Sequence, residues 1–136
     1  MKATDLMIGD WVKIKGHLDY DKVREIARDE NMQWYISFAC SAVLFRAYEF
    51  EPIPLTPEIL EKNGFGFVKS SDRDSVWNGW WINRGLELAT ACLDKEGNWP
   101  CYINIYDSNI KCEYVHQLQH ALRLCGLDEL ADNFKV

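Results

Sequence analysis

The sequence predicts an α+β protein, and two segments carry most of that prediction. Residues 86–93 and 99–106 alternate in polarity on either side of a short polar stretch, which is typical of a β-hairpin. Residues 113–125 carry apolar side chains at helical spacing and are followed by Gly126, which favours an amphipathic helix that ends at a glycine. Each element is apolar on one side, so we expect an antiparallel sheet packed by the C-terminal helix.

The N-terminal half contains further strand patterns. After a turn at Gly9 and Asp10, residues 11–15 alternate between apolar side chains and lysines, which predicts a strand. Residues 21–29 fit an amphipathic helix or a strand, and their spacing does not choose between the two. Residues 32–50 are rich in aromatic and β-branched side chains, which favours one or two strands.

A short helix is the clearest element in the middle of the chain. Thr56 is a good N-cap, and Pro57 suits the first helical position because a proline has no N–H to leave unbonded there. Asn63 and Gly64 favour the end of this helix because both tolerate the left-handed backbone conformation. We expect one to two turns.

The composition indicates one compact domain. The 136 residues are 48% apolar and 13% aromatic, which suits a core of the size usual for a single domain. Within it, we expect a β-rich unit over residues 1–52 and a helix–sheet–helix unit over residues 53–136. No apolar run reaches the length of a membrane span, and the N-terminal residues lack a signal-peptide pattern. These features predict a cytoplasmic protein without membrane contact.

The charge balance argues against one class of partner. The formal net charge is −6 at pH 7, and neither half of the chain is basic. Proteins that hold duplex nucleic acid through its phosphates concentrate Lys and Arg, so nonspecific duplex binding is not expected. The five cysteines show no C-x-x-C spacing, which favours thiols in a reducing compartment over a disulfide framework.

Two segments resemble a known family. The pattern IPLTPEILEKNGF at residues 53–65, together with YVHQLQ at residues 114–119, is similar to a family of short proteins from Bacteroidetes genomes and from the phages and mobile elements of those bacteria. Its members commonly open with a strand like residues 9–12. The resemblance implies a small SH3-like β-barrel as the N-terminal unit, with a strand rather than a helix at residues 22–28. It implies no particular activity, and the chain departs from the commoner pattern at His120.

The C-terminal helix carries a weak candidate set of metal ligands. Cys112, His116 and His120 are spaced i, i+4 and i+8, and zinc is commonly held by such side chains. However, no fourth ligand stands at a diagnostic spacing. On a helical wheel His116, His120 and Arg123 lie opposite the apolar stripe, so we interpret them as a solvated polar face. We expect no metal and no cofactor.

The chain contains no recognisable catalytic motif. Nucleophilic catalysis needs a Ser or Cys beside a base, and no G-x-S-x-G pattern is present. The glycines within residues 64–67 lack the Lys and Ser/Thr of a phosphate-binding loop. Many active sites leave no short motif, so these observations lean against an enzyme without excluding one.

A tryptophan cluster is the most unusual local feature. Residues 76–83 indicate a strand that follows an earlier one at residues 65–69, and three tryptophans lie within five positions there. Side chains alternate along a strand, so the three cannot share one face; packing on both faces of a central strand explains them as well as a surface contact does. Tryptophan and arginine are enriched at binding hot spots. The candidate partner-binding residues are Trp77, Trp80, Trp81 and Arg84.

These observations favour binding over catalysis. We expect a non-catalytic protein-interaction or accessory module of a mobile element, whose partner is another protein or a second copy of the chain. One alternative is a module that binds single-stranded nucleic acid by stacking bases on aromatic rings. Another is a small enzyme without a recognisable motif, which a deep cleft lined by histidines or paired carboxylates would favour.

Overall fold

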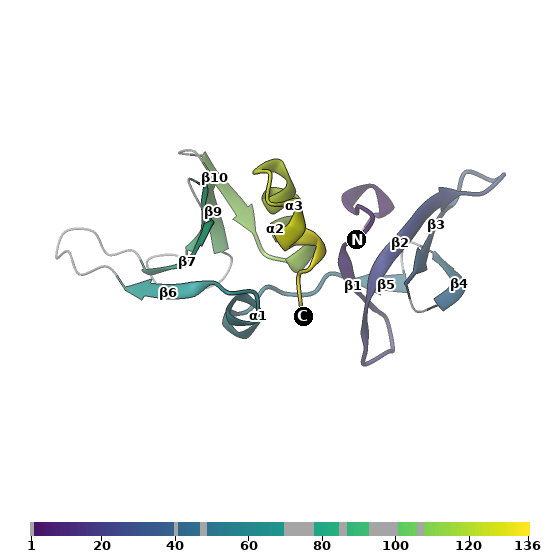
Figure 1. The fold of residues 1–136 in the computed structure, drawn as a ribbon. Helices are drawn as coiled ribbons and strands as arrows, with labels where there is room; N and C mark the ends of the chain where they lie inside the picture. Colours follow the sequence, from purple (N-terminus) through teal and green to yellow (C-terminus); the bar gives the residue numbers. More distant parts are fainter. Residues whose placement is uncertain are drawn as a thin grey trace. The chain divides into compact units, whose positions relative to one another are not determined.

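The computed structural model divides the chain into two compact units, Met1–Ile53 and Pro54–Val136. Each unit contains one five-stranded antiparallel sheet, and short helices accompany the strands (Figure 1). The α+β class predicted from the sequence is confirmed. The structure describes residues 2–39, 41–46, 49–69, 78–84, 87–92, 101–105 and 108–136.

The first unit is a meander whose first strand also pairs with its last. The strand order is β4-β3-β2-β1-β5, and β3 and β4 are the two strands expected within residues 32–50. Among the described residues no pairing joins β4 to the two-residue β5, so the sheet is open and is not closed into the expected barrel. The elements are η1 (Ala3–Asp5), β1 (Trp11–Ile14), β2 (Tyr20–Arg28), β3 (Trp34–Phe38), β4 (Ser41–Arg46) and β5 (Phe50–Glu51).

Residues 21–29 fit either a helix or a strand by their spacing, and in the structure most of them belong to strand β2. Its first residues pair with β1 and the others with β3, and the register shifts between Val23 and Glu25. Such a bulge bends a strand, which suits one that passes from one pairing partner to another. Val23 is buried while Arg24 beside it is exposed, as expected for a sheet with one buried face. The strand expected over residues 22–28 is confirmed.

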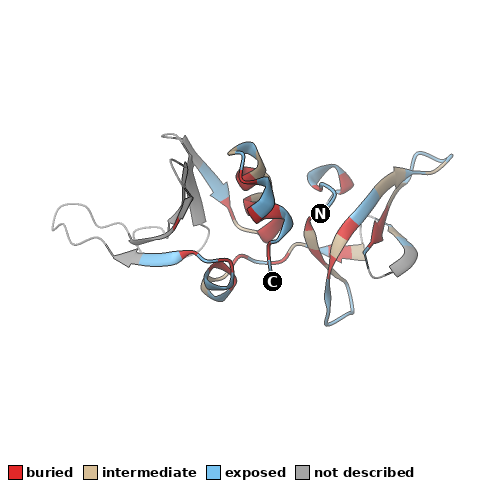
Figure 2. Cartoon of the chain, viewed as in Figure 1, coloured by how far each residue is buried: buried red, intermediate tan, exposed pale blue. Residues whose placement is uncertain are grey.

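Alternate residues of these strands form the core of the first unit (Figure 2). The ring of Phe38 has its centroid 5.3 Å from that of Phe45 and 5.6 Å from that of Phe50, in tilted and edge-on arrangements. Aromatic pairs prefer such geometries to direct face-to-face stacking. The buried members of the cluster are Ala3, Leu6, Val12, Val23, Ile36, Phe38 and Phe50.

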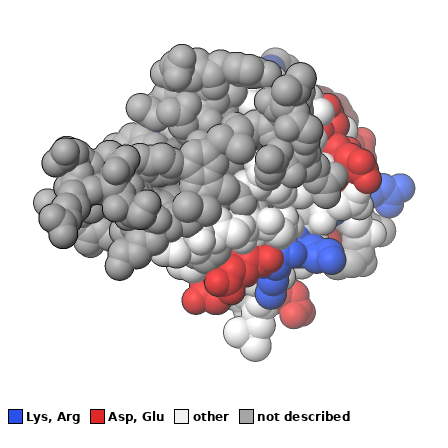
Figure 3. Space-filling model, turned by 60° about the vertical axis from the view of Figure 1, so that its left-hand side comes forward, with Lys and Arg blue, Asp and Glu red and all other residues white. Residues whose placement is uncertain are grey.

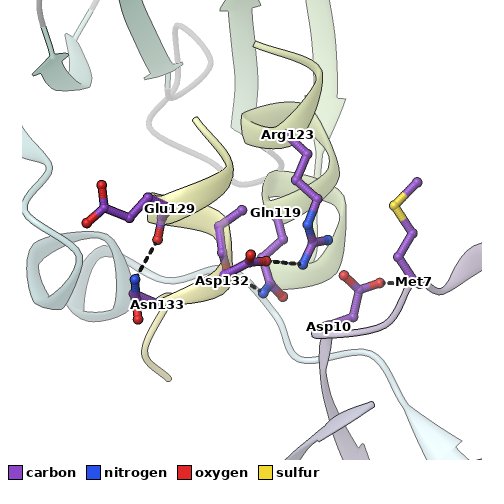
Figure 4. A network of polar contacts seen from close by, with 8 residues as sticks. Met7, Asp10, Gln119, Arg123, Glu129, Asp132 and Asn133 are labelled. Atoms are coloured by element: carbon purple, nitrogen blue, oxygen red, sulfur yellow. Dashed lines mark hydrogen bonds and ion pairs between the residues drawn. The ribbon is translucent and has the colours of Figure 1, made fainter. Parts of the chain in front are cut away.

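Asp10 fixes the turn that leads into β1. Its side chain is fully buried, and Oδ2 accepts the N–H of Met7 at 2.8 Å (Figure 4). Gly9 has a φ of 90°, a conformation that costs glycine little, and its N–H donates to the carbonyl of Val23 at 2.7 Å. The carbonyl of Asp10 accepts the N–H of Val23 at 2.9 Å. The turn is therefore tied to β2 through two backbone hydrogen bonds.

The second unit contains the other five-stranded sheet, with the order β10-β9-β8-β7-β6. Strands β8 and β9 pair as the expected hairpin, while its turn at residues 94–98 lies outside the described residues. Helix α1 precedes the sheet, and α2 and α3 follow it and lie side by side (Figure 1). The elements are α1 (Pro57–Lys62), β6 (Gly66–Lys69), β7 (Asn78–Arg84), β8 (Glu87–Cys92), β9 (Cys101–Ile105), β10 (Ser108–Cys112), α2 (Val115–Leu124) and α3 (Asp128–Asp132).

The spacing of residues in the sequence does not predict strand β10. Residues 107–109 are polar and favour a turn, yet a strand begins at Ser108 and runs to Cys112. It pairs in register with all five residues of β9. Pairing with a neighbouring strand outweighs the local turn preference. The helix expected over residues 113–125 accordingly begins at Val115.

Helix α1 begins and ends as the sequence predicts. The Oγ1 of Thr56 accepts the N–H of Ile59 at 3.4 Å, and Pro57 occupies the first helical position. Gly64, just beyond the helix, has a φ of 81°. The capped short helix is therefore confirmed, together with its glycine end.

Helix α2 has ten residues and buries more than its apolar stripe. Val115, Leu118 and Leu122 are buried as expected, and so is Gln119. Nε2 of Gln119 donates to the carbonyl of Ala131 at 2.9 Å, which joins α2 to α3 (Figure 4). Within the described ranges, no helix is long and apolar enough to cross a membrane.

Asn63 joins the end of α1 to the C-terminal segment. Its Nδ2 donates to the carbonyl of Ile59 at 2.7 Å and to that of Lys135 at 2.8 Å. Its Oδ1 accepts the N–H of Lys135 at 2.8 Å. The side chain is 8% exposed, so one buried amide satisfies backbone groups from segments that lie 72 residues apart.

The two segments that resemble the Bacteroidetes family meet in this unit. Pro54 and Tyr114 form an isolated antiparallel bridge, and the N–H of Leu55 donates to the carbonyl of Glu113 at 3.0 Å. Oε1 of Gln117 accepts the N–H of Glu113 at 2.7 Å and that of Tyr114 at 3.2 Å, which satisfies N–H groups at the start of α2. The leucines and isoleucines of both segments are buried. These residues tie the entry of α1 to the start of α2.

We expect Asp10→Ala to lower the free energy of unfolding by about 2 kcal/mol, because it removes a buried acceptor from the N–H of Met7. Urea denaturation measures the loss. Asp5→Ala is the matched control: Oδ2 of Asp5 accepts the N–H of Lys2 at 2.9 Å over the same spacing, but on an exposed side chain. The control should cost less than about 1 kcal/mol. Equal losses would contradict a special role for Asp10.

Asn63→Ala should lower the free energy of unfolding by about 3 kcal/mol, because three backbone groups lose their partner in a buried site. Asn133→Ala is the control, since Nδ2 of the exposed Asn133 donates to the carbonyl of Glu129 at 2.9 Å. Its removal should cost less than about 1 kcal/mol. A thermal or urea unfolding curve for Asn63→Ala that overlays the parent curve would show that the tie is dispensable.

Candidate functional site

An apolar row crosses the sheet of the second unit from edge to edge. Phe67 pairs with Trp80, and Trp80 pairs with Ala91. Ile103 lies opposite Ala91 on one side and opposite Ile110 on the other. Directly opposed residues of an antiparallel sheet share a face. We call this set the cross-strand row; each of the five strands contributes one apolar residue to it.

Both ends of the cross-strand row are exposed. Phe67 on the edge strand β6 is 47% exposed, and Ile110 on the edge strand β10 is 39% exposed. Single exposed apolar residues are common on protein surfaces. Here two of them end the same row, so the row reaches solvent at both edges of the sheet.

The tryptophan cluster falls partly within this row. Trp80, Trp81 and Arg84 lie in β7, a central strand that pairs with β6 and β8. Trp81 pairs with Gly66 and therefore occupies the neighbouring row. Trp77 lies outside the described residues. Among the described members of the cluster, Trp80 alone belongs to the cross-strand row.

A second surface combines aromatic and cationic side chains on the outer face of β1 and β2. Val12 lies in the core, so alternation places Trp11 and Lys13 on the opposite side of β1. The register pairs Trp11 with Lys22 and Lys13 with Tyr20. Nζ of Lys22 lies 5.2 Å from the centroid of the Trp11 ring, within the range of a cation–π contact.

Another cation–π pair has a structural role. Cζ of Arg28 lies 4.0 Å from the ring centroid of Trp34. Trp34 packs against the core of the first unit. Arg28 therefore covers a ring that the core already uses, and the pair stabilises the end of the β2–β3 hairpin.

The hairpin turn between β2 and β3 is held by Asp29. Its Oδ1 accepts the N–H of Gln33 at 2.8 Å and that of Asn31 at 2.9 Å. The hydrogen bond from Gln33 is the main cause that lowers the pKa of Asp29. Met32 in the same turn has a φ of 61°, which is uncommon for a residue other than glycine. The turn thus relies on a carboxylate that bridges two backbone N–H groups.

Exposed charges on the second unit are mixed in sign. Nη2 of Arg123 lies 3.2 Å from Oδ1 of Asp132, and Nζ of Lys111 lies 2.9 Å from Oε1 of Glu113. Figure 3 shows acidic and basic side chains next to one another on the described part of one face. Pairs with an exposed partner contribute little to stability. They also reduce the attraction of that surface for a polyanion.

The three side chains considered as metal ligands lie in different environments. Cys112 ends β10 and is fully buried, and burial raises the pKa of its thiol to about 12. A thiol that stays protonated is a poor metal ligand. His116 is 5% exposed and stacks on Tyr114 with ring centroids 5.9 Å apart, while His120 is half-buried and meets His116 edge-on.

The interpretation of His116 as part of a solvated polar face is therefore wrong. Helix α2 packs against both β10 and α3, so its buried surface is wider than one apolar stripe. Among the described side chains, no group of three His, Cys, Asp or Glu is placed to hold a metal.

A shallow cavity of about 250 Å³ lies between the end of α1 and α3. Drug-sized ligands usually occupy larger pockets. Asn63 at its wall is fully engaged with backbone groups, and Nζ of Lys62 donates to the carbonyl of Val136 at 3.2 Å. The lining residues are Lys62, Asn63, Glu129, Leu130, Asn133 and Lys135. This cavity lacks the histidines or close carboxylate pair that would favour an enzyme.

The sequence alone indicated neither the exposed ends of the cross-strand row, Phe67 and Ile110, nor the second surface on β1 and β2. Phe67 was placed in a strand, but its exposure follows from the position of β6 at the edge of the sheet. The contact between Trp11 and Lys22 depends on the register of β1 against β2. The alternation of Trp11 and Lys13 with buried residues was the available indication of an outer face.

The protein is of the α+β class, and the two surfaces described above lie on its sheets. No protein-family model matches the chain, and neither a curated protein nor a solved structure matches it significantly. The membership suggested by residues 53–65 and 114–119 accordingly stays a prediction.

Cys112 should resist alkylation by iodoacetamide at pH 8 in the folded protein and react fully in urea, because burial keeps its thiol protonated. Peptide mass spectrometry reads the modification, with the half-buried Cys125 as the internal reference. The raised pKa of the Cys112 thiol stabilises the fold at pH values below 9.0, the ordinary pKa of this group. That contribution is lost as the pH rises from 9.0 towards 12. Fast native labelling of Cys112 would contradict its burial.

Proposed function

We propose that the chain is a non-catalytic protein-interaction module and that the cross-strand row binds another protein. The observation that carries this proposal is the exposure of both ends of the row, at Phe67 and Ile110. Aromatic residues dominate binding energy at protein interfaces, and Trp80 occupies the position next to Phe67. A partner that covers Phe67 and Ile110 would remove their apolar surface from water.

The buried polar groups favour a binding role over catalysis. Asp10, Asn63 and Gln119 each accept from or donate to backbone groups that hold the fold together. The thiol of Cys112 has a pKa raised by burial, whereas a nucleophilic cysteine needs a lowered one. These four side chains therefore act as structural groups, and the unusual side chains that face solvent lie on the sheets.

We also infer that residues 1–53 form an SH3-like unit. The strand order β4-β3-β2-β1-β5 supports this, since a meander whose last strand returns to the first is the arrangement such a unit requires. The bulge in β2 supports it as well, because a bend in this strand lets its two halves pair with β1 and with β3. The role in a mobile element rests on the resemblance of residues 53–65 and 114–119.

Phe67→Ser should abolish capture of a protein partner while leaving the fold intact, because the side chain is exposed at the edge of the sheet. We expect the affinity to fall at least about 30-fold, the size typical of a hot-spot residue. The tagged chain is used to capture proteins from host lysate with and without nuclease, and the partner is then titrated against the purified variants.

Leu124→Ser is the matched control, because Leu124 is an 80% exposed leucine on α2, outside the row. It should bind like the parent. Trp80→Ala tests the next position of the row, with circular dichroism to confirm folding. A protein partner that survives nuclease treatment and binds Phe67→Ser as tightly as the parent would refute the proposal. Sedimentation of the purified chain distinguishes a second copy from a different protein.

A further inference from the structure

We propose that the outer face of β1 and β2 binds single-stranded nucleic acid, with bases stacked on its aromatic rings and phosphates contacted by its basic side chains. This site lies in the first unit and does not depend on the cross-strand row. Its residues come from β1, β2, the turn after β1, and β5. Its members are Trp11, Lys13, Lys15, Tyr20, Lys22, Arg24 and Glu51.

Alternation and register bring these side chains to one side of the sheet. On β1, Trp11 and Lys13 alternate with core residues, and Lys15 follows at the same spacing beyond the strand. On β2, Tyr20 and Lys22 alternate with buried residues in the same way. Arg24, at the bulge, is exposed.

This face is open to solvent. Tyr20 is 44% exposed, and Lys15 is exposed beyond the end of β1. Trp11, Lys13 and Lys22 are half-buried, in part against one another, because the ammonium of Lys22 lies over the Trp11 ring. The N-terminal segment contributes its apolar residues to the core cluster. It therefore packs on the opposite side of the sheet.

The local charge differs in sign from that of the whole chain. Four basic side chains occupy this face. Beside them lie the carboxylates of Glu51, opposite Lys13 on β5, and of Glu49, whose carbonyl accepts the N–H of Lys15 and whose side chain accepts the N–H of Arg46. Glu25, next to Arg24, is also exposed. In the described parts of the chain, no ion pair engages Lys13, Lys15 or Arg24. A cationic strip of this kind attracts a phosphate chain even on an acidic protein, since the Debye length at physiological salt is only about 8 Å.

The rings of Trp11 and Tyr20 favour single-stranded nucleic acid over other polyanions. Trp11 and Tyr20 are diagonal neighbours across the β1–β2 pair, with Cα atoms roughly 7–8 Å apart in such a position. Successive unpaired bases can each stack on one ring, which contributes about 1–3 kcal/mol per base. Paired bases in a duplex are not available for such stacking. An acidic peptide would use the lysines and leave the rings without a role, so single strands fit the face best.

The test is fluorescence anisotropy of the full chain with a labelled oligothymidylate of about 15 nucleotides. We expect a Kd of about 1–100 μM at physiological salt. Raising the salt from about 50 to 200 mM should weaken binding about 20- to 50-fold if three or four phosphates are contacted. A duplex of the same length should bind more weakly.

Variants separate stacking from charge. Tyr20→Ala should weaken binding about 10-fold, whereas Tyr20→Phe keeps the ring and should bind like the parent. The double variant Lys13→Gln/Lys22→Gln should reduce the salt slope by about 1.4. The charge-matched control is Lys62→Gln/Lys135→Gln, which removes two lysines from the second unit and should leave binding unchanged. Circular dichroism confirms that each variant folds.

Three outcomes would overturn the proposal. One is the absence of binding up to about 1 mM, beyond the range of nonspecific nucleic-acid affinity. Another is equal binding of a polyglutamate peptide of the same charge, which would make the face a general polyanion site. The last is an unchanged affinity in Tyr20→Ala, which would remove stacking from the mechanism.

Discussion

The tie between the entry of α1 and the C-terminal part of the chain is the constraint on which the second unit depends. Leu55 bonds to Glu113, and Asn63 bonds to Lys135, so the two ends of the unit are held together by hydrogen bonds between buried or half-buried groups. All five strands of the second sheet lie between these contacts. Closing a loop of this length costs entropy, which the bonds and the buried leucines around them offset.

This use of polar groups has a consequence for function. A buried amide or carboxylate that already satisfies backbone partners cannot also serve a ligand without breaking the fold. Asn63, Asp10 and Gln119 are all committed in this way. These three groups are therefore structural, and both proposed binding surfaces lie on the sheets instead.

The two units offer different surfaces. The cross-strand row of the second unit is apolar along its whole length and ends in exposed Phe67 and Ile110, which suits a protein partner. The outer face of β1 and β2 pairs rings with lysines, as in the contact between Trp11 and Lys22, which suits an unpaired polyanion.

The sequence by itself determined what depends on neighbouring residues. Thr56, Pro57 and Gly64 define α1 because caps and left-handed ends are local preferences, and the apolar spacing of residues 113–125 defines α2. The candidacy of Trp80 for binding rests on the local cluster of tryptophans and stays a prediction.

Only the tertiary structure decided what depends on distant neighbours. Residues 21–29 became a strand because β1 and β3 pair with them, and β10 formed against β9 in spite of its turn residues. His116 became buried because α2 packs against both β10 and α3. Phe67 became exposed because its strand lies at an edge, and Lys22 reached Trp11 because of the register. Pairing, register and edge position arise from contacts between remote segments, which local spacing does not specify.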